Sequence, residues 1–417
     1  METPESAASP SASRGRRRIP RNLWAVSGTS FLTDVSSEMV VNLVPLFLAN
    51  VLGARTVTIG LIEGVAASTA SLIKVFSGAF SDRLRARKWL AVAGYAISAL
   101  AKPGYYFAMS WGAVAGVRWA ERAGKGVREA PRDALVAGSV DAADRGLAFG
   151  MHRAADTGGA VVGLLIAVAV VGLVQSGGFD LTRDAFQLIV LISLVPAFLA
   201  VLTLAIGAVE VRRPPTSDAP RIGFRGLGRR FGVFLAIVAL FDLGNFSDAF
   251  LILRAQERGL GVSEVLWMLM AFNLVYALLS TPAGALSDRF GRKRLIVAGW
   301  VVYAAIYLGF ALAESGRHVV ALTICYGAYY GLVTGTAKAL VADLVPAPLH
   351  GTAFGTYNAT LGLIDLPASL IAGLLWQGIG PWQGFGPSAP FFFGAATALA
   401  AALLLAVFVR EPPQPPE

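Results

Sequence analysis

The chain has 417 residues, of which 55% are hydrophobic and 15% are charged. Soluble domains usually contain about 25% charged residues, so this composition indicates a membrane protein instead of a set of soluble domains. The net charge of +9 does not indicate a nucleic-acid-binding protein, because the arginines fall in short polar segments between apolar runs, where membrane topology requires them.

Long apolar runs recur along the chain and lack the alternating pattern of a membrane β-barrel. About 20 apolar residues cross a bilayer as a helix, and only helices or closed barrels satisfy the backbone there. The sequence therefore predicts an all-α membrane protein with about twelve transmembrane helices. Their expected limits are 24–51, 58–81, 89–109, 111–138, 147–174, 185–208, 231–253, 262–287, 294–313, 318–344, 352–377 and 388–409.

The segments outside these helices are polar and mostly basic. We expect residues 1–23 to form a disordered N-terminal tail, 209–230 a linker, and 411–417 a proline-rich C-terminal tail. Arginine and lysine also gather after the second and eighth expected helices, on the same face as the tail and the linker. Because cytoplasmic loops carry an excess of these residues, both termini and the linker are predicted to be cytoplasmic, in the inner or plasma membrane of the cell.

Residues that bind metals or react with substrates are few. Cys325 is the single cysteine, and His152, His318 and His350 are far apart in the sequence. We therefore expect no disulfide within the chain, no metal and no cofactor. Residues 124–126 read GKG but lack the leading glycine and the Ser or Thr of a phosphate-binding loop, so neither an enzyme nor an ATP-driven pump is expected.

Two segments of the chain occur a second time in similar form, both at nearly the same offset in residue number, which indicates an internal repeat. The sequence SGAFSDRLRARK, residues 77–88, returns as AGALSDRFGRKR at 283–294. The sequence VDAADRGLAFG, residues 140–150, returns as VPAPLHGTAFG at 345–355. We therefore predict two pseudo-symmetric six-helix bundles, 24–208 and 231–410, with the substrate site between them near the middle of the membrane.

The first of these repeats carries the motif G-x-L-x-D-R-x-G-R-[KR], through which the chain resembles the major facilitator superfamily from about residue 24 to 409. The second copy is complete: Gly284, Leu286, Asp288, Arg289, Gly291, Arg292 and Lys293. The first copy keeps Gly78, Asp82, Arg83 and Arg87. It departs at Phe80, Arg85 and Ala86. The resemblance implies that both copies form a gate at the cytoplasmic face, where the Asp lies near the positive end of another helix.

The fourth expected helix carries a stripe of charges on an otherwise apolar surface. At about 100° per residue, one arc holds Arg118, Glu121, Arg122, Lys125, Arg128, Glu129, Arg132 and Asp133. A charge at the bilayer centre costs about 2.5–3.5 kcal/mol or more, so the stripe should face protein or a wet cavity, although its last residues can instead reach the headgroups. Pro131 should kink or interrupt the helix around Val127 and free a carbonyl group there.

Ionisable residues in other expected helices complete a polar site. We predict a substrate cavity that contains Lys74, Arg118, Lys125, His152, Arg153, Asp156, Asp242, Asn245, Lys338 and Asp365. Asp34 and Glu38, one helical turn apart, are the candidate proton sites, and Arg122 is their candidate partner. Two plainer interpretations stay open: the carboxylates can simply neutralise the cations, and His152 can be an interior histidine with satisfied hydrogen bonds.

The resemblance to the superfamily also bears on Arg122. Its R-x-x-Q-G pattern is matched by Arg122, Lys125 and Gly126, with Lys in place of Gln, and in proton-coupled members this arginine is associated with the coupling. The carboxylates in the first expected helix are likewise reminiscent of the drug/proton antiporters of the family.

Three hypotheses about function follow. The first is a secondary active transporter that works by alternating access, most simply the proton-coupled efflux of a drug or metabolite. The second is proton-coupled transport of an organic anion, a carboxylate or phosphate ester, in either direction, because deep cations bind such groups. The third, from another class, is a non-transporting receptor or assembly factor on the same fold. We expect a monomer whose partners are a small-molecule substrate, protons and lipid.

Overall fold

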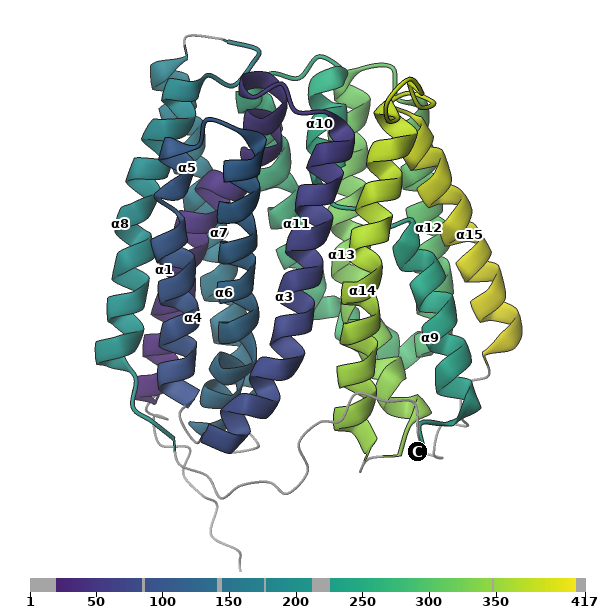
Figure 1. The fold of residues 1–417 in the computed structure, drawn as a ribbon. Coiled ribbons are helices and arrows are strands. Elements are labelled where there is room, and N and C mark those ends of the chain that lie inside the picture. The colour runs from purple at the N-terminus through teal and green to yellow at the C-terminus, as the bar shows by residue number, and fades with distance from the viewer. Residues whose placement is uncertain are drawn as a thin grey trace, which may run out of the picture.

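The computed structural model describes residues 20–84, 87–140, 145–175, 178–211, 226–346 and 349–409. Most of the predicted tail 1–23, the greater part of the linker 209–230, and the whole tail 411–417 lie outside these residues. All the secondary structure in the described ranges is helical, as the sequence predicts. The helices stand side by side with their axes in one general direction (Figure 1).

Each expected transmembrane segment corresponds to one helix or to a helix with a break. The first half contains α1 (Arg21–Val41), α2 (Val44–Leu46), the π-helical turn η1 (Phe47–Val51), α3 (Thr56–Leu84), α4 (Arg87–Ala101), α5 (Gly104–Phe107), α6 (Trp111–Gly138), α7 (Arg145–Val174) and α8 (Arg183–Gly207). The second half contains α9 (Gly228–Leu243), α10 (Ala249–Glu257), α11 (Val262–Phe290), α12 (Arg292–Leu312), α13 (Gly316–Leu344), α14 (His350–Gln377) and α15 (Ala389–Phe408).

Three of the expected segments are broken where the sequence disfavours a continuous helix. Pro45 lies in the first turn of α2, and Pro103 precedes α5. A proline has no N–H to donate to an earlier carbonyl, so each marks the end of the preceding helix. Between α9 and α10 the chain leaves the helix from Gly244 to Asp248. This α9–α10 break forms one wall of the cavity described below.

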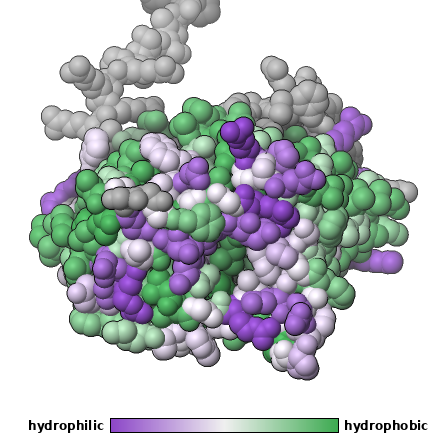
Figure 2. Space-filling view, turned by 90° about the horizontal axis from the view of Figure 1, so that it is seen from above, coloured by the Kyte–Doolittle hydropathy of each residue, from purple (hydrophilic) through white to green (hydrophobic). Residues whose placement is uncertain are grey.

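Nine helices in the described part of the chain are long and apolar enough to cross a membrane. Among the remaining segments, α4 and α9 are short pieces of broken helices, and α6 carries the charge stripe. Seen from above, hydrophobic side chains occupy the flanks of the molecule, and hydrophilic ones gather across its middle (Figure 2). This distribution suits a protein whose flanks face lipid.

Except for α3 and α14, which pack most extensively on each other, helices α1 to α8 pack mainly against one another, as do α9 to α15. In the first half α1 packs on α7 and α8, and in the second half α12 packs on α13 and α15. The main helix pairs that join the halves are α3 with α14 and α7 with α11. The described chain begins and ends at the lower end of the view in Figure 1, which the basic residues of the sequence predict to be cytoplasmic.

Glycines allow the closest of these helix contacts. A Cβ added at Gly163 of α7 would lie 3.1 Å from the Cα of Val35 on α1. Between the halves, a Cβ added at Gly373 of α14 would lie 2.6 Å from the Cα of Val57 on α3. Small residues let helix backbones approach in this way, and without a hydrophobic driving force in lipid such close packing is what holds helices together.

Helix α6 runs without interruption from Trp111 to Gly138 although it contains Pro131. A proline cannot donate to the carbonyl four residues earlier, which here is that of Val127. The hydroxyl of Ser77 on α3 donates to this carbonyl instead. The prediction of a freed carbonyl at Val127 is therefore confirmed, and a neighbouring helix satisfies it, so the helix does not end there.

Arg254 of α10 is fully buried and joins three elements at the upper end of the second half. Its Nε donates to the carbonyl of Phe310 at 3.0 Å, and its Nη2 donates to the carbonyl of Ala311 at 3.0 Å. These carbonyls belong to the last turn of α12, where carbonyl groups have no N–H donor within the helix. Nη2 also donates to Ser388 Oγ at 3.0 Å, just before α15.

Candidate functional site

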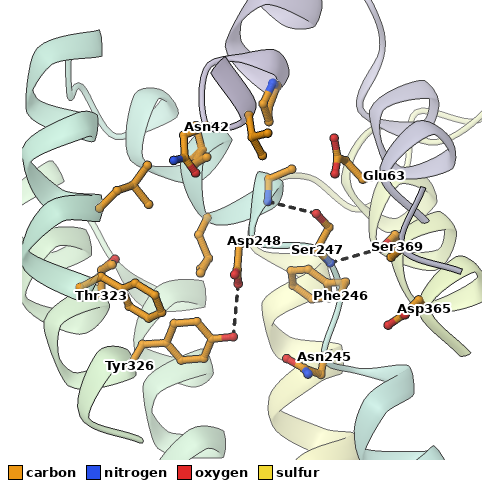
Figure 3. A pocket seen from close by; sticks show the side chains of 18 of the residues that line it. Asn42, Glu63, Asn245, Phe246, Ser247, Asp248, Thr323, Tyr326, Asp365 and Ser369 are labelled. Atoms are coloured by element: carbon orange, nitrogen blue, oxygen red, sulfur yellow. Dashed lines mark hydrogen bonds between the residues drawn. The ribbon is translucent and has the colours of Figure 1, made fainter. Parts of the chain in front are cut away.

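A cavity of about 450 Å³ lies between the two halves. Its walls come from α1, α3 and α6 on one side, and from the α9–α10 break, α11, α13 and α14 on the other (Figure 3). Polar residues that line it are Glu38, Asn42, Glu63, Arg118, Arg122, Asn245, Ser247, Asp248, Asn273, Thr323, Asp365 and Ser369. Aromatic residues that line it are Phe246, Phe272, Tyr326 and Tyr330. A volume of this size is typical of a small-molecule site.

Arg118 and Glu63 form an ion pair on the first-half side of the cavity. Arg118 of α6 donates from Nε to Glu63 Oε1 at 2.9 Å and from Nη2 to Oε2 at 2.7 Å. The exposed fractions of the two residues are 3% and 5%. Because two parallel bonds satisfy both carboxylate oxygens, the charge of Arg118 is compensated before any substrate binds.

Arg122 lies one turn further along α6 and lines the same cavity. It makes no hydrogen bond or ion pair with any residue in the described ranges, and its Nε is buried. Arg118 and Glu63 are among its electrostatic neighbours. In this structure Arg122 is therefore not paired with Asp34 or Glu38, and its guanidinium can meet a group that enters the cavity.

The two carboxylates predicted to bind protons have different surroundings. Glu38 lines the cavity and accepts a hydrogen bond from Asn42 Nδ2 at 2.8 Å. Asp34, one turn earlier on α1, is half-buried behind the cavity, within electrostatic range of Lys125 and Asp156. Glu38 can thus contact a substrate directly, whereas Asp34 responds to charges on α6 and α7.

The second half contributes two further carboxylates to the cavity. Asp248 precedes the first turn of α10, and its Oδ1 accepts a hydrogen bond from the Tyr326 hydroxyl at 3.3 Å (Figure 3). Asp365 comes from α14 on the other side of the break (Figure 3). Asn245 lies within the break, where its Oδ1 accepts from the Tyr303 hydroxyl at 3.2 Å. The cavity is therefore more acidic on this side.

The structure brings some of the predicted site residues to the cavity and leaves others elsewhere. Those that line it are Glu38, Arg118, Arg122, Asn245 and Asp365. Those that lie outside it are Asp34, Lys74, Lys125, His152, Arg153, Asp156, Asp242 and Lys338. The helical wheel explains part of this division, because it groups residues by the face of a helix but not by their depth in the membrane.

Three of the deep cations outside the cavity lie close to two acidic residues. Glu129 of α6 pairs with two lysines: its Oε2 lies 2.8 Å from Lys74 Nζ of α3, and its Oε1 lies 3.7 Å from Lys125 Nζ. Lys102, which is buried behind α6, lies 3.6 Å from Glu121 Oε1. Part of the excess of deep cations that favours an organic anion in the sequence is therefore compensated within the first half.

His152 is an interior histidine with partners at both ring nitrogens. Its Nε2 lies 2.9 Å from Ser30 Oγ, and its Nδ1 lies 3.3 Å from Asp156 Oδ2, one turn further along α7. Asp156 Oδ1 is buried and has no hydrogen-bond partner in the described part of the chain. This geometry agrees with the plainer interpretation of His152.

The remaining predicted residues have three separate settings. Asp242 of α9 is buried, and its Oδ1 accepts from Asn245 Nδ2 at 3.3 Å. The guanidinium of Arg153 lies 4.9 Å from the centre of the Tyr276 ring, a cation–π contact between α7 and α11. Lys338 of α13 is exposed. These residues remain candidates for a part in transport, but not as walls of this cavity.

Hydrogen bonds join the halves at the upper end of the molecule. Arg55 Nη2 donates to the carbonyl of Gln377 at 3.0 Å, and the Thr56 N–H donates to Gln377 Oε1 at 2.8 Å. Gln256 Nε2 donates to Asp180 Oδ1 at 3.2 Å. Each bond links a residue of the first half to one of the second, so all of them must break if the halves part at this end.

The predicted gate motif is only partly visible. Outside the described side chains lie Gly78, Asp82, Arg83, Gly284, Asp288 and Arg289. Gly291, between α11 and α12, has a φ of 86°, which a side chain would disfavour. Arg292 begins α12 and pairs with Asp343 near the end of α13, while Arg87 begins α4. The turn between α11 and α12 therefore favours glycine at position 291 of the complete copy.

Two charged residues that line the cavity, Glu63 and Asp248, are absent from the predicted substrate cavity. Glu63 stands alone in the apolar run of the second expected helix, and a lone carboxylate in such a run is itself a signal of function. Asp248 lies near the predicted Asp242 and Asn245, at the point where the helix breaks. The break was not predicted, so Asp248 was not placed in the cavity.

Comparison with known proteins gives the family. The sequence profile of the Major Facilitator Superfamily matches residues 26–232 and again 231–417. The chain belongs to the major facilitator superfamily. Like the superfamily members it matches, the protein is a multi-pass membrane transporter, and its substrate is a small molecule.

Individual members of the superfamily show how far the similarity extends. The chain is 35% identical over 397 residues to an uncharacterised MFS-type transporter of Methanocaldococcus jannaschii, covering 93% of this chain and 95% of that protein. It is 29% identical over 163 residues to multidrug resistance protein 1 of Bacillus subtilis, covering 39% and 40%. A mutant of the nucleoside transporter NupG has the same fold, with a TM-score of 0.76 at 15% identity, covering 93% of this chain and 100% of that one.

Proposed function

We propose that this transporter exports a small molecule from the cytoplasm in exchange for protons. The observation that carries the proposal is the place of Glu38, a membrane carboxylate that lines the cavity one turn from Asp34, together with Arg122, which has no partner among the described residues. A carboxylate in such a place binds or releases a proton when the charges around it change.

The exchange follows because the proton and the substrate compete for the carboxylates of Asp34 and Glu38. When they are ionised, Asp34 attracts Lys125 on α6, and Glu38 can hold a substrate or a cation between the halves. When a proton neutralises either carboxylate, that attraction falls and the substrate loses a partner. Binding a proton and binding the substrate therefore exclude each other, which is the requirement for antiport.

The similarity to multidrug resistance protein 1, which covers 39% of the chain, supports export over import. The basic segments of the sequence predict that the lower end of Figure 1 is cytoplasmic, and the bonds at the upper end hold the halves together on the opposite side. Importers and exporters that work by alternating access both pass through such a state, so it is compatible with the proposed export.

Transport of an organic anion is a second candidate. It is favoured by Arg122, whose guanidinium faces the cavity without any described partner. Arginine binds carboxylates and phosphates through two parallel hydrogen bonds, so an anionic substrate would supply what Arg122 lacks.

The proposal can be tested with purified protein in liposomes. A pH gradient with an acidic lumen is imposed, and uptake of the cationic dye ethidium and the anionic dye carboxyfluorescein is followed by fluorescence. We expect one dye to accumulate in the acidic lumen and to leave when an ionophore dissipates the gradient. Asp34→Asn and Glu38→Gln should each reduce this accumulation by about tenfold or more.

Asp184→Asn is the matched control, because Asp184 is an exposed carboxylate in the first turn of α8, away from the cavity. It should transport at the rate of the unaltered protein. Normal gradient-driven rates in both Asp34→Asn and Glu38→Gln would contradict the assignment of the proton sites. Uptake that does not respond to the gradient would contradict proton exchange itself.

A further inference from the structure

The balance of charged residues in the cavity indicates the charge of the substrate. Four carboxylates line the cavity, those of Glu38, Glu63, Asp248 and Asp365. Two guanidiniums line it, those of Arg118 and Arg122. Glu63 and Arg118 neutralise each other through their paired bonds, and Asp365 lies within electrostatic range of Arg122. Among the residues that the structure describes, no cation compensates Glu38 or Asp248.

Asp248 is the more accessible of these two carboxylates. It is exposed although it lies between the halves, and it makes no ion pair with any residue that the structure describes. Its partner is the hydroxyl of Tyr326, a neutral donor at 3.3 Å (Figure 3). A carboxylate in the membrane with space beside it and no cation of its own is an incomplete ion pair.

The α9–α10 break adds neutral acceptors next to Asp248. In a continuous helix the carbonyls of Asn245 and Phe246 would accept bonds from residues four positions further on. Here neither carbonyl accepts a hydrogen bond from a described backbone or side chain, and both residues line the cavity. Unwound carbonyls within a membrane helix favour positive charge nearby, as they do in other transporters with broken helices.

Aromatic rings cover the same part of the cavity. The centres of the Phe272 and Tyr326 rings lie 5.6 Å apart, and those of Tyr326 and Tyr330 lie 5.0 Å apart. The faces of such rings attract organic cations, and their apolar surface suits the body of a drug-sized molecule. A carboxylate, unpaired carbonyls and aromatic rings thus converge on one place.

We propose that the substrate of this cavity is an organic cation, whose positive group pairs with Asp248 beside the α9–α10 break and whose apolar body packs against Phe272 and Tyr326. The assignment rests on the proposed export of a small molecule through this cavity and adds the charge of that molecule. Glu38 then acts as the second carboxylate, which binds a proton when the cation leaves.

Equilibrium binding to the full-length protein in lipid nanodiscs tests the assignment without any transport or pH gradient. The probes are tetraphenylphosphonium and tetraphenylborate, ions of nearly the same size and shape but opposite charge. Binding to empty nanodiscs is subtracted from each curve. We expect saturable binding of the phosphonium ion and none of the borate.

Variants locate the bound ion. Asp248→Asn should weaken binding of the phosphonium ion by about tenfold or more, because it removes the carboxylate that pairs with the cation between the halves. Asp248→Glu keeps the charge and should keep most of the affinity, and Asp184→Asn should leave the affinity unchanged.

Three results overturn the assignment. The first is saturable binding of the borate that Arg122→Gln abolishes, which identifies an anion site. The second is the absence of saturable binding of both ions. The third is a phosphonium affinity that Asp248→Asn leaves unchanged. If Asp248→Asn does not fold, the comparison of the two ions on the unaltered protein still decides the charge. Cation binding without proton-driven uptake would contradict the proposed exchange and leave the substrate class intact.

Discussion

Arg118 and Glu63 face each other across α6 and α3, with both oxygens of the carboxylate bonded to one guanidinium at 2.7 and 2.9 Å. The pair is nearly inaccessible to solvent, at 3% and 5% exposure. Each partner therefore depends on the other, since the loss of either leaves a buried charge without its bonded counter-ion.

Glu63→Gln should destabilise the protein strongly. The change leaves Arg118 charged and buried without its counter-ion, at a cost of about 3–5 kcal/mol. Thermal unfolding in detergent measures the effect as a lower midpoint. The double variant Glu63→Gln with Arg118→Gln removes both charges and should recover much of the loss. A double variant as unstable as Glu63→Gln alone would show that packing, and not charge pairing, holds this site together.

Ser77→Ala should lower stability more than an ordinary loss of a hydroxyl. The Ser77 hydroxyl is the donor to the Val127 carbonyl that Pro131 leaves unsatisfied, so its removal costs about 1–3 kcal/mol. Thr69→Ala on the same helix is the matched control, because the Thr69 hydroxyl donates to the Val65 carbonyl within its own helix. Equal thermal stability of the two variants would mean that the Val127 carbonyl finds another donor.

Arg254→Lys should destabilise the upper end of the second half although it keeps the charge. A lysine cannot reproduce the fork that donates to Phe310 and Ala311 at 3.0 Å each, and the loss amounts to about 3 kcal/mol. Thermal unfolding again supplies the measurement. Arg258→Lys is the control, since Arg258 is partly exposed and pairs with Glu257 at 3.1 Å. A similar effect of both substitutions would contradict a special role for Arg254.

Gln256→Ala should open the upper end more often. The change removes the bond to Asp180 that joins the halves, and one such bond contributes about 0.5–1.5 kcal/mol, which corresponds to a population change of about 2–12-fold. The reporter is Asn42→Cys, a cavity position, in a chain whose exposed Cys325 is replaced by serine. A membrane-impermeant thiol reagent added from outside should label it faster when Gln256→Ala is present.

The control for this experiment is Asp184→Asn, which changes a side chain near the upper end without touching a bond between the halves. Unchanged labelling in Gln256→Ala would show that the Arg55 and Thr56 bonds to Gln377 suffice to keep the halves together.

The sequence predicted the helical segments well, because hydropathy is a local property of the chain. Even the effect of Pro131 on Val127 could be foreseen, since a missing N–H has a fixed consequence four residues earlier. The partner of Arg118 could not be foreseen in the same way. Glu63 lies 55 residues away, and the depth at which α3 and α6 meet depends on tertiary packing that no local pattern records.

The cavity shows the same limit. A helical wheel places Arg118, Arg122 and Lys125 on one face, but only the first two reach the cavity, because the stripe extends along the helix beyond it. Asp248 enters the site because α9 and α10 separate at Gly244, a break that hydropathy alone does not reveal. The acidic balance of the cavity therefore became visible only when residues of both halves were brought together.

Proton movement measured during substrate movement tests the central claim most directly. Liposomes contain the protein and a trapped pH-sensitive dye, and there is no initial pH gradient. The transported probe is then added to the outside solution. Exchange predicts that the lumen becomes alkaline as the probe enters, and that the double variant Asp34→Asn with Glu38→Gln abolishes this change. Entry of the probe at the normal rate with no change in lumen pH would contradict the account.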